Sequence, residues 1–496
     1  MLYIRVVNTA SGARAVQVIY YRNRKRVIYK HIGSAHTDEE VNELKRVAQA
    51  FIDTRIPFLP GFQDTNSYSL LHLDKSEFLG VYHTFFHEVF SLLIRKLGFN
   101  DFCVQLLLDL VIMRVFEPAS KLRSIELLNT YFGIKHRRQA FYDLAPSWLA
   151  LKEKAEAVCL KHARINHGFR YELLFYDVTT LYFEAFEEDE LRKKGFSKDN
   201  KSEQPQILVA LMVTKEGFPV AYDIFPGNTF EGNTILPVIK KFIERHAVQD
   251  FTIVADAAMI SSENIQSFRD NNINYIVGAR LGNLSSKLFD ELDSSINRVD
   301  GESVRVKTDN GYLICSFSST RYRKDKHEME RQIEKAKAAI KTPARNRRLK
   351  FVKSNNSKIE LNEALIEKTG KLLGLKGYFT NLEEDIASNN TIMERYGELY
   401  KIEHAFRISK NDLETRPVFH YKEEPIKLHI LICFMALALS KEIELKTGVS
   451  IRKFTTECKK VTDARILNLI TSKEIRIRAK ASQEIEAYLG NLNLSH

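Results

Sequence analysis

The sequence has few cysteines and no apolar run long enough to cross a membrane. Its five cysteines are dispersed with no C-x-x-C pair, which argues against a disulfide framework and against a structural zinc site. The most apolar stretch, Ile430–Leu439, is too short to span a bilayer, and the first residues lack the apolar segment of a secretory signal. These absences predict a cytoplasmic protein without a membrane segment, in which Ile430–Leu439 is a buried core helix. The cysteines are Cys103, Cys159, Cys315, Cys433 and Cys458.

Acidic residues are outnumbered, and the formal net charge is +11. A hydrophobic content of 44% and an aromatic content of 10% are typical of a folded globular protein. At 496 residues the chain is too long for one core, so three or four structural units are expected. The charge favours a polyanionic partner, of which nucleic acid is the commonest.

The positive charge is concentrated in Arg321–Lys353, which holds thirteen Lys or Arg and four Asp or Glu. One interpretation is a solvated helix face with ion pairs one turn apart. The imbalance favours a nucleic-acid contact instead. Arg345, Arg347 and Arg348 are the candidate DNA-binding residues of this segment.

Changes of pattern predict five segments along the chain. Residues 1–80 form a β-rich unit with a helix, and residues 81–168 form a helical DNA-binding region. Residues 169–283 and 385–445 form a catalytic domain, residues 284–384 a basic β-rich insertion, and residues 446–496 a helical tail. In the first segment, the basic turn at residues 21–26 is either a solvated turn or a phosphate contact, and a capped helix is expected over residues 37–52.

A helix–turn–helix is a candidate within the second segment. Its helices would be Ser120–Tyr131 and His136–Leu144, joined by a turn at Gly133. Arg137 and Arg138 would then lie at the start of the second helix, where recognition residues reach DNA. Two helices around a glycine are also common in ordinary bundles.

The catalytic segment alternates between strand and helix patterns. Strands are expected at 173–183, 207–214, 219–225, 251–257 and 275–279, and helices at 233–246 and 261–271. The first three strands are closely linked, which indicates an antiparallel meander, and the later strand–helix–strand run indicates parallel additions. The fold class predicted is therefore α/β (α+β), with a mixed sheet of the RNase H-like layout.

Three carboxylates in this segment are candidates for one catalytic site. Asp177 lies inside an apolar strand and Asp256 ends another, although strands disfavour Asp and burial of a carboxylate is costly. Glu403 lies in a helical pattern, Tyr396–Lys410, on a stripe that mixes aromatic, acidic and basic residues. Each acid has a structural alternative, such as an ion pair from Glu403 to Arg407. Two acids on strands and one on a later helix could instead converge on divalent cations.

These motifs resemble those of the DDE transposases of bacterial insertion sequences. The narrower resemblance is to the branch with Tyr-x2-Arg-x3-Glu-x6-Lys, for which this chain has Tyr396, Leu399, Glu403 and Lys410. Leu399 replaces the arginine of that signature, and Arg395, Lys401 or Arg407 could substitute for it. The strings Tyr-Asp-Val-Thr-Thr around the first acid and Val-Ala-Asp-Ala-Ala around the second also match, although relatives often carry Arg-Gly after the second acid. The resemblance extends from about residue 82 to 445.

The resemblance implies a site and a chemistry. Asp177, Asp256 and Glu403 would bind two Mg²⁺ ions, for which Mn²⁺ can substitute, and would catalyse in-line displacement at phosphorus. Water would first free a 3′-OH at the element end, and that 3′-OH would then attack target DNA. Tyr396, Arg407 and Lys410 would contact DNA. The single tryptophan, Trp148, is expected in a helical core, so no hairpin intermediate is assigned.

The expected partners are the DNA of the element ends and of the target. A dimer is expected in the DNA complex, because two ends must be paired. Three alternatives remain: a related nuclease without strand transfer, an inactive DNA-binding repressor, and a protein in which the acids are structural. A steep fall in DNA affinity with salt would fit the first two and not the third.

Overall fold

The computed structural model describes residues 2–22, 25–53, 75–184, 186–196, 203–246, 248, 251–259, 261–309, 311–341, 349–355, 358–416, 418, 420–469 and 472–494. The chain divides into two compact units. The larger unit comprises Ser91–Ser124 and His136–Arg452. The smaller unit comprises Met1–Phe90, Ile125–Lys135 and Lys453–His496.

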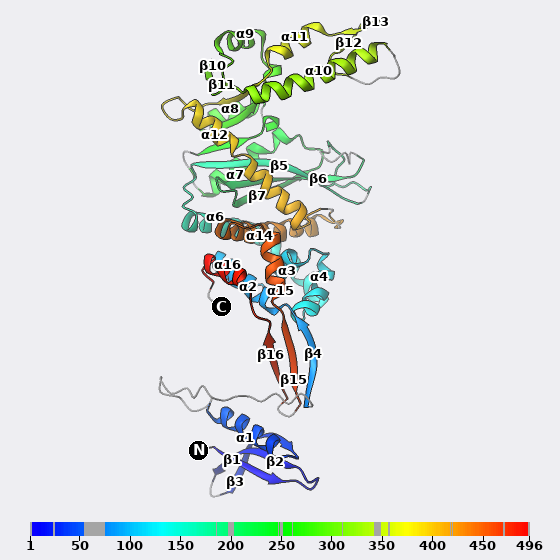
Figure 1. Ribbon diagram of the computed structural model, residues 1–496, viewed down its shortest axis with the longest axis vertical. Coiled ribbons are helices and arrows are strands. Elements are labelled where there is room, and N and C mark those ends of the chain that lie inside the picture. The colour runs from blue at the N-terminus through cyan, green and yellow to red at the C-terminus, as the bar shows by residue number, and fades with distance from the viewer. Residues whose placement is uncertain are drawn as a thin grey trace. The chain divides into compact units, whose positions relative to one another are not determined.

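An eight-stranded mixed sheet is the centre of the larger unit (Figure 1). Its strand order is β10-β11-β14-β9-β8-β5-β6-β7. The strands are β5 (Leu173–Tyr182), β6 (Gln206–Thr214), β7 (Pro219–Pro226), β8 (Thr252–Ala255), β9 (Asn274–Ala279), β10 (Ser303–Thr308), β11 (Gly311–Phe317) and β14 (Leu375–Thr380).

The five strands expected from the sequence are confirmed, with their directions. β5, β6 and β7 pair antiparallel as a meander, and β8 pairs parallel with β5 and with β9. All nine residues of β6 are buried, as expected for a strand covered on both faces. The prediction of a mixed α/β sheet is therefore confirmed.

The predicted insertion contributes three strands to this same sheet. β14 pairs antiparallel with β9, and β11 and β10 continue outward from it. A core that includes Phe289, Leu292, Leu313 and Leu375 lies at this end of the sheet. β10, β11 and β14, which lie within the predicted insertion, thus extend the central sheet and belong to its compact unit.

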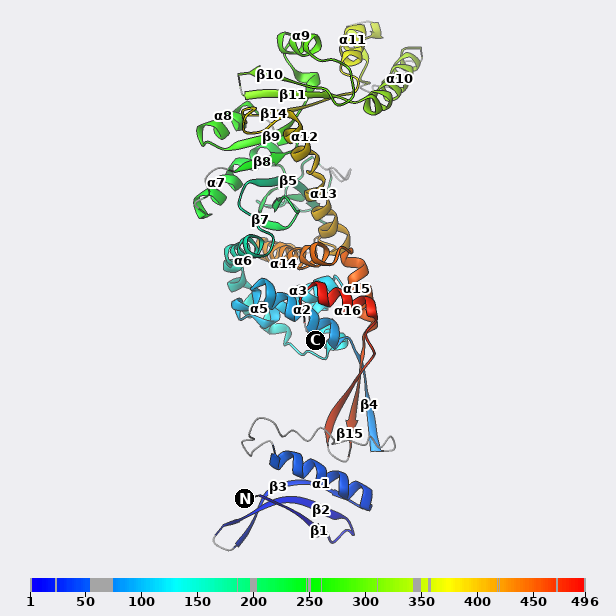
Figure 2. The same ribbon diagram turned by 60° about the vertical axis from the view of Figure 1, so that its left-hand side comes forward.

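Helices cover both faces of the sheet. Figure 2 shows α7 and α8 on one side and α12 and α13 on the other. These helices are α7 (Ile235–His246), α8 (Ser262–Asp270), α12 (Asn389–Gly397) and α13 (Tyr400–Arg407). The other helices of the unit are α3 (Gln105–Phe116), α4 (Lys121–Leu127), α5 (Arg138–Trp148), α6 (Lys152–Asn166), α9 (Ser286–Ser295), α10 (Ser319–Lys341), α11 (Glu363–Lys371) and α14 (Glu423–Thr447). A hairpin of β12 (Val352–Asn355) and β13 (Lys358–Leu361) completes it.

The apolar run Ile430–Leu439 is the middle of α14. Every residue from Leu428 to Ile443 in this helix is buried, and α14 packs against α3 and β7. The prediction of a buried core helix is confirmed. None of the helices in the described chain is both long and apolar enough to span a bilayer.

The smaller unit contains two three-stranded sheets. β1 (Tyr3–Asn8), β2 (Arg14–Arg22) and β3 (Lys25–Ala35) form one sheet, against which α1 (Asp38–Asp53) packs. Thr37 caps α1, because its hydroxyl accepts from the Glu40 amide while the Glu40 carboxylate accepts from the amides of His36 and Thr37. The helix expected at residues 37–52 is therefore confirmed.

The C-terminal segment is not wholly helical, and that prediction was wrong. Between α15 (Ile451–Lys460) and α16 (Gln483–Asn491), the chain forms a hairpin of β15 (Asp463–Asn468) and β16 (Lys473–Arg478). β15 also pairs with β4 (Ser76–Tyr82), a strand nearly 400 residues earlier in the chain. Residues 446–496 thus complete a sheet with the end of the first predicted segment.

Candidate active site

Asp177 lies in the middle of β5. It is half-buried, whereas the residues on either side of it in the strand are buried. It shares a face of the sheet with Phe175 and Thr179, because strand side chains alternate. The amide of Val178 donates a 2.7 Å hydrogen bond to the Asp177 carboxylate.

Asp256 directly follows the strand next to that of Asp177. Tyr176 pairs with Ala255, the last residue of β8, in the parallel β5–β8 ladder, so Asp177 and Asp256 are the residues that follow this pair. Asp256 is exposed, and the amide of Ala257 donates a 2.6 Å hydrogen bond to it. It stands at the carboxyl end of β8, which is where α/β sheets place ligands.

Tyr396, from the end of α12, lies over this end of the sheet. Its hydroxyl donates to the Asp256 carboxylate at 3.5 Å, and its ring packs against Tyr378 with 4.8 Å between centroids. A Cβ at Gly278 of β9 would lie 2.5 Å from the Tyr396 hydroxyl, so a larger residue at that position would displace the Tyr396 side chain. Burial, together with the charges of Asp256 and Glu403, raises the pKa of Tyr396 above its ordinary value.

Glu403 is exposed on α13, which packs on β5. One turn further along the helix, Phe406 and Thr179 line the same small cavity, about 30 Å³ in volume, on the face of β5 that also carries Asp177. Residues three apart share a helix face. Glu403 is exposed one turn before Phe406, whereas Ile402, Ala405 and Phe406 form the buried face of α13.

The helix of Glu403 differs from the prediction in one respect. Tyr396–Lys410 is not one continuous helix: α12 ends at Gly397, a turn follows, and α13 begins at Tyr400. Leu399, in the place of the signature arginine, is N-terminal to α13 and buried, with 8% of its surface exposed. It belongs to the core and cannot replace a phosphate contact.

The three acids do not form a closed metal cage. In the described part of the chain, one group of three His, Cys, Asp or Glu side chains has ligand atoms within 4.8 Å of one another, and it is His162, His167 and Glu442. The acids nevertheless suit Mg²⁺ chemically, since all three offer carboxylate oxygens. In a site with two ions about 3.5–4 Å apart, the carboxylates are shared between the ions. The carboxylates of such a site can therefore lie further from one another than the ligands of a single ion.

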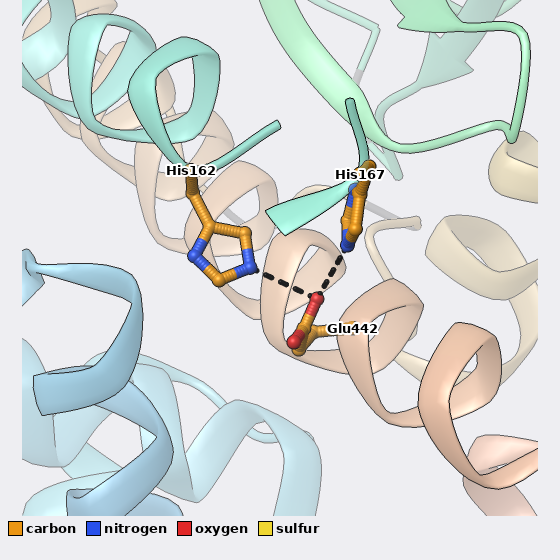
Figure 3. A group of neighbouring side chains, drawn as sticks. All are labelled: His162, His167 and Glu442. Atoms are coloured by element: carbon orange, nitrogen blue, oxygen red, sulfur yellow. Dashed lines mark hydrogen bonds and ion pairs between the residues drawn. The ribbon is translucent and has the colours of Figure 1, made fainter. Parts of the chain in front are cut away.

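The His162, His167 and Glu442 cluster is a buried hydrogen-bond network (Figure 3). His162 Nε2 and His167 Nε2 lie 3.0 Å and 2.8 Å from the same Glu442 oxygen. The Asn166 amide group lies 3.1 Å from His162 Nδ1. Lys96 Nζ lies 3.9 Å from the other Glu442 oxygen.

This arrangement gives one Glu442 oxygen two hydrogen bonds, whereas the other oxygen and His167 Nδ1 are buried without a hydrogen-bond partner among the described residues. Burial alone would raise the pKa of Glu442, but the hydrogen bonds and charges of His162 and His167 lower it below the ordinary range. The network joins the end of α6 to α14. The sequence offered no signal for it, because its members lie about 280 residues apart.

The predicted DNA-binding residues have different surroundings. Arg137 and Arg138 are exposed at the start of α5, which begins at residue 138, two residues later than expected. His136 instead lies 2.7 Å from the buried Asp109. Arg407 is exposed at the end of α13, and Lys410 lies in the helical turn that follows.

The basic segment is only partly within the described residues. Arg345, Arg347 and Arg348 lie outside them. In α10, three of the cations form ion pairs along the helix: Arg321 with Asp325, Arg331 with Glu328, and Lys337 with Glu334. These pairs agree with the interpretation of α10 as a helix with ion pairs one turn apart, and the nucleic-acid contact stays a prediction.

Comparison with known proteins gives the family of this chain. The sequence matches the transposase DDE domain over residues 168–439, more than half of the chain. The protein therefore belongs to the DDE transposase family, whose members are DNA-processing enzymes that generally use divalent metal ions.

Other comparisons are more distant. A search of curated proteins found no match. Among solved structures, the chain is similar to the cryo-EM structure of a piggyBac transposase synaptic complex with hairpin DNA. That similarity has a TM-score of 0.39 and 11% sequence identity, and it covers 85% of this chain and 77% of the other.

Proposed function

We propose that the protein is the transposase of a bacterial insertion sequence, which cleaves the element ends and joins the freed 3′-OH to target DNA. The observation that carries this proposal is the position of Asp177 on β5 next to Asp256, which follows the adjacent parallel strand β8, with α13, the helix of Glu403, packed against β5. The meander followed by parallel strands supports an RNase H-like catalytic domain. Asp177, Asp256 and Glu403 are its catalytic and metal-binding residues.

The side chains of this site would hold the ions and orient the DNA. Asp177 and Asp256 would hold one edge of the metal site from the sheet, and Glu403 would close it from α13. When bound, two Mg²⁺ or Mn²⁺ ions activate the attacking oxygen and stabilise the leaving oxygen of an in-line displacement. Tyr396 would orient Asp256 through its hydroxyl and so act as a positioning residue beside the DNA.

Basic residues would bind the DNA backbone. Arg407 and Lys410 follow Glu403 on the same helical segment and would contact phosphates close to the scissile bond. Arg137 and Arg138 would contact the element end, and Arg345, Arg347 and Arg348 would add contacts from the basic segment. Both element ends would be held by a dimer, acting on DNA in the bacterial cytoplasm and at the nucleoid.

Cleavage by the carboxylate variants tests this function. Asp177→Asn, Asp256→Asn and Glu403→Gln should each lower strand cleavage at least about 10³-fold, equivalent to about 4 kcal/mol of transition-state stabilisation, while DNA binding persists. Cleavage is measured on a labelled duplex of the element end with Mg²⁺ or Mn²⁺. Glu394→Gln, an exposed carboxylate on α12, is the matched control and should cleave normally.

A second substrate separates a transposase from a related nuclease. A pre-cut end with a free 3′-OH, incubated with a target plasmid, should yield joined product with the wild type and none with the three variants. Cleavage without joining would indicate a nuclease, and DNA binding without either would indicate a repressor. Near-normal cleavage by any of the three variants would refute the assignment.

A further inference from the structure

A cavity lined by basic groups lies apart from the three acids in the larger unit. It has a volume of about 120 Å³, several times the share of a water molecule in the liquid, about 30 Å³. We call it the basic pocket and define it by Arg114, Lys121, Arg416, His420 and His429. These residues come from α3, from the start of α4, from the segment before α14, and from α14 itself.

Lys121 has one hydrogen-bond partner in the described chain. Its Nζ lies 2.9 Å from His429 Nδ1, and His429 Nε2 donates to the carbonyl of Thr415 at 2.9 Å. His429 therefore carries its proton on Nε2 and accepts from Lys121 through Nδ1. Lys121 is 3% exposed, and the rest of its hydrogen-bonding capacity remains available to a ligand.

The basic pocket holds buried positive groups with little negative charge nearby. The Arg114 guanidinium is buried and donates to the backbone carbonyl of Ala119 at 2.7 Å. No carboxylate within the described ranges forms an ion pair with Lys121 or Arg114. The one acid that lines the cavity, Glu414, is exposed.

The excess of buried positive charge shifts the pKa values of the ionisable groups in the basic pocket. Burial, together with the charges of Lys121 and Arg114, lowers the pKa of His420 to about 4 and the pKa of His429 below its ordinary value. Burial and Arg114 lower the pKa of Lys121. An anion in the pocket would reverse these shifts, because it favours the charged form of each group.

A larger and more apolar cavity adjoins the basic pocket. Its volume is about 330 Å³, and it shares Ser120, Lys121 and His420 with the basic pocket. Two aromatic side chains, Phe141 and the exposed Tyr142, line it together with Pro146 and Leu428. A cavity of this size and lining accommodates a small organic group, and aromatic rings can stack on a nucleobase.

We propose that the basic pocket binds the phosphate group of a nucleotide, whose sugar and base occupy the adjoining apolar cavity. Arg114, Lys121 and Arg416 would neutralise the phosphate, and Tyr142 would contact the base. The nucleotide is either free or part of a DNA strand, and the second source rests on the proposed function. Glu414 and the exposed Glu424 at the edges of the two cavities would restrict the anion to the basic groups.

Calorimetry on the full-length protein, without added metal, tests this site. The ligands are thymidine 5′-monophosphate, inorganic phosphate, thymidine and a short single-stranded oligonucleotide. The monophosphate should bind more tightly than phosphate or thymidine alone. Lys121→Gln and Arg416→Gln should each weaken it at least about tenfold, and Tyr142→Ala about fivefold with little effect on inorganic phosphate.

Binding should also take up protons. Affinity should increase from pH 8 to pH 6, and the enthalpy should depend on the ionisation enthalpy of the buffer. The matched control is Lys154→Gln, an exposed lysine on α6, which should bind like the wild type. Thermal unfolding shows whether each variant is folded. If Lys121→Gln does not fold, the binding of Arg416→Gln provides the test.

The outcomes distinguish a free nucleotide from a DNA strand as the ligand. They also distinguish failure of this site from failure of the proposed catalytic site. Competition between the oligonucleotide and the monophosphate supports a DNA source, and monophosphate binding without competition supports a free nucleotide. Absence of binding by every ligand, or equal loss in Lys154→Gln, overturns the site. Asp177→Asn should bind the monophosphate normally, so failure of the catalytic assignment would leave this result unchanged.

Discussion

Two groups of carboxylates in the larger unit differ in what surrounds them. Glu442 is fully buried and accepts hydrogen bonds from two histidines, with a lysine close to its second oxygen. Asp256 and Glu403 are exposed, and Asp177, in the middle of β5, is half-buried. Histidine and lysine side chains of the protein surround Glu442, whereas Asp256 and Glu403 face solvent. Convergence of ligating atoms alone therefore does not identify a catalytic metal site.

The largest effect on stability is expected at the buried network. Glu442→Ala should lower the free energy of unfolding by about 3–5 kcal/mol, because it leaves buried polar groups without their partner. Urea denaturation of the full-length protein measures this change. Glu394→Gln is the control and should unfold like the wild type. An unchanged midpoint for Glu442→Ala would show that the network does not stabilise the fold.

Glu442 should also make the free energy of unfolding depend on pH. The pKa of Glu442 is lowered in the folded state, so its stabilisation is present above the pKa of the unfolded chain, about 4.3. This contribution is lost as the pH falls through the folded pKa. Between pH 5 and pH 3, the wild type should therefore lose stability more steeply than Glu442→Gln. Parallel stability profiles would contradict the depressed pKa.

A smaller effect on catalysis is expected from the contact between Tyr396 and Gly278. Gly278→Ala should slow cleavage about tenfold, since the added Cβ would displace the hydroxyl that holds Asp256. Tyr396→Phe should slow it about threefold, which corresponds to about 0.7 kcal/mol for one hydrogen bond. Single-turnover cleavage rates measure both.

The double variant sharpens this prediction. Gly278→Ala should have a smaller effect in the Tyr396→Phe background, because the hydroxyl that meets the new Cβ is absent. Gly397→Ala is the matched control, since a Cβ there meets nothing within 4 Å. Additive effects of the two substitutions would show that they act independently of the contact.

The smallest effect is expected from the arginines of α5. Arg137→Gln and Arg138→Gln should each reduce the slope of log affinity against log salt by about 0.9, if each contacts one phosphate. Affinity for an element-end duplex is measured by fluorescence anisotropy over a series of salt concentrations. Lys154→Gln should leave the slope unchanged. An unchanged slope in the arginine variants would remove α5 from the DNA interface.

The sequence predicted those features whose signal is local. The five strands around Asp177 and Asp256 were found because buried strands read as apolar runs bounded by turns. The capped helix α1 was predicted for the same reason, from Thr37 and the acids that follow. The adjacency of Asp177 and Asp256 then depends only on the parallel pairing of β5 with β8.

The features that the sequence did not predict are strand pairings between distant residues and one break in a helix. β14 joins β9 across about 100 residues, and β15 pairs with β4 across nearly 400, so no local pattern encodes either partner. The alternation of Lys473–Arg478 was a readable strand signal, hidden by its charge. The helix break before Glu403 had one signal, Gly397, within an otherwise continuous stripe.

Metal binding without DNA tests the central assignment most directly. Mn²⁺ titration followed by electron paramagnetic resonance should show binding by the wild type. Asp177→Asn, Asp256→Asn and Glu403→Gln should weaken that binding at least about tenfold, while Glu442→Gln should bind as the wild type does. Loss of Mn²⁺ binding in Glu442→Gln, with binding retained in the other three variants, would contradict the account.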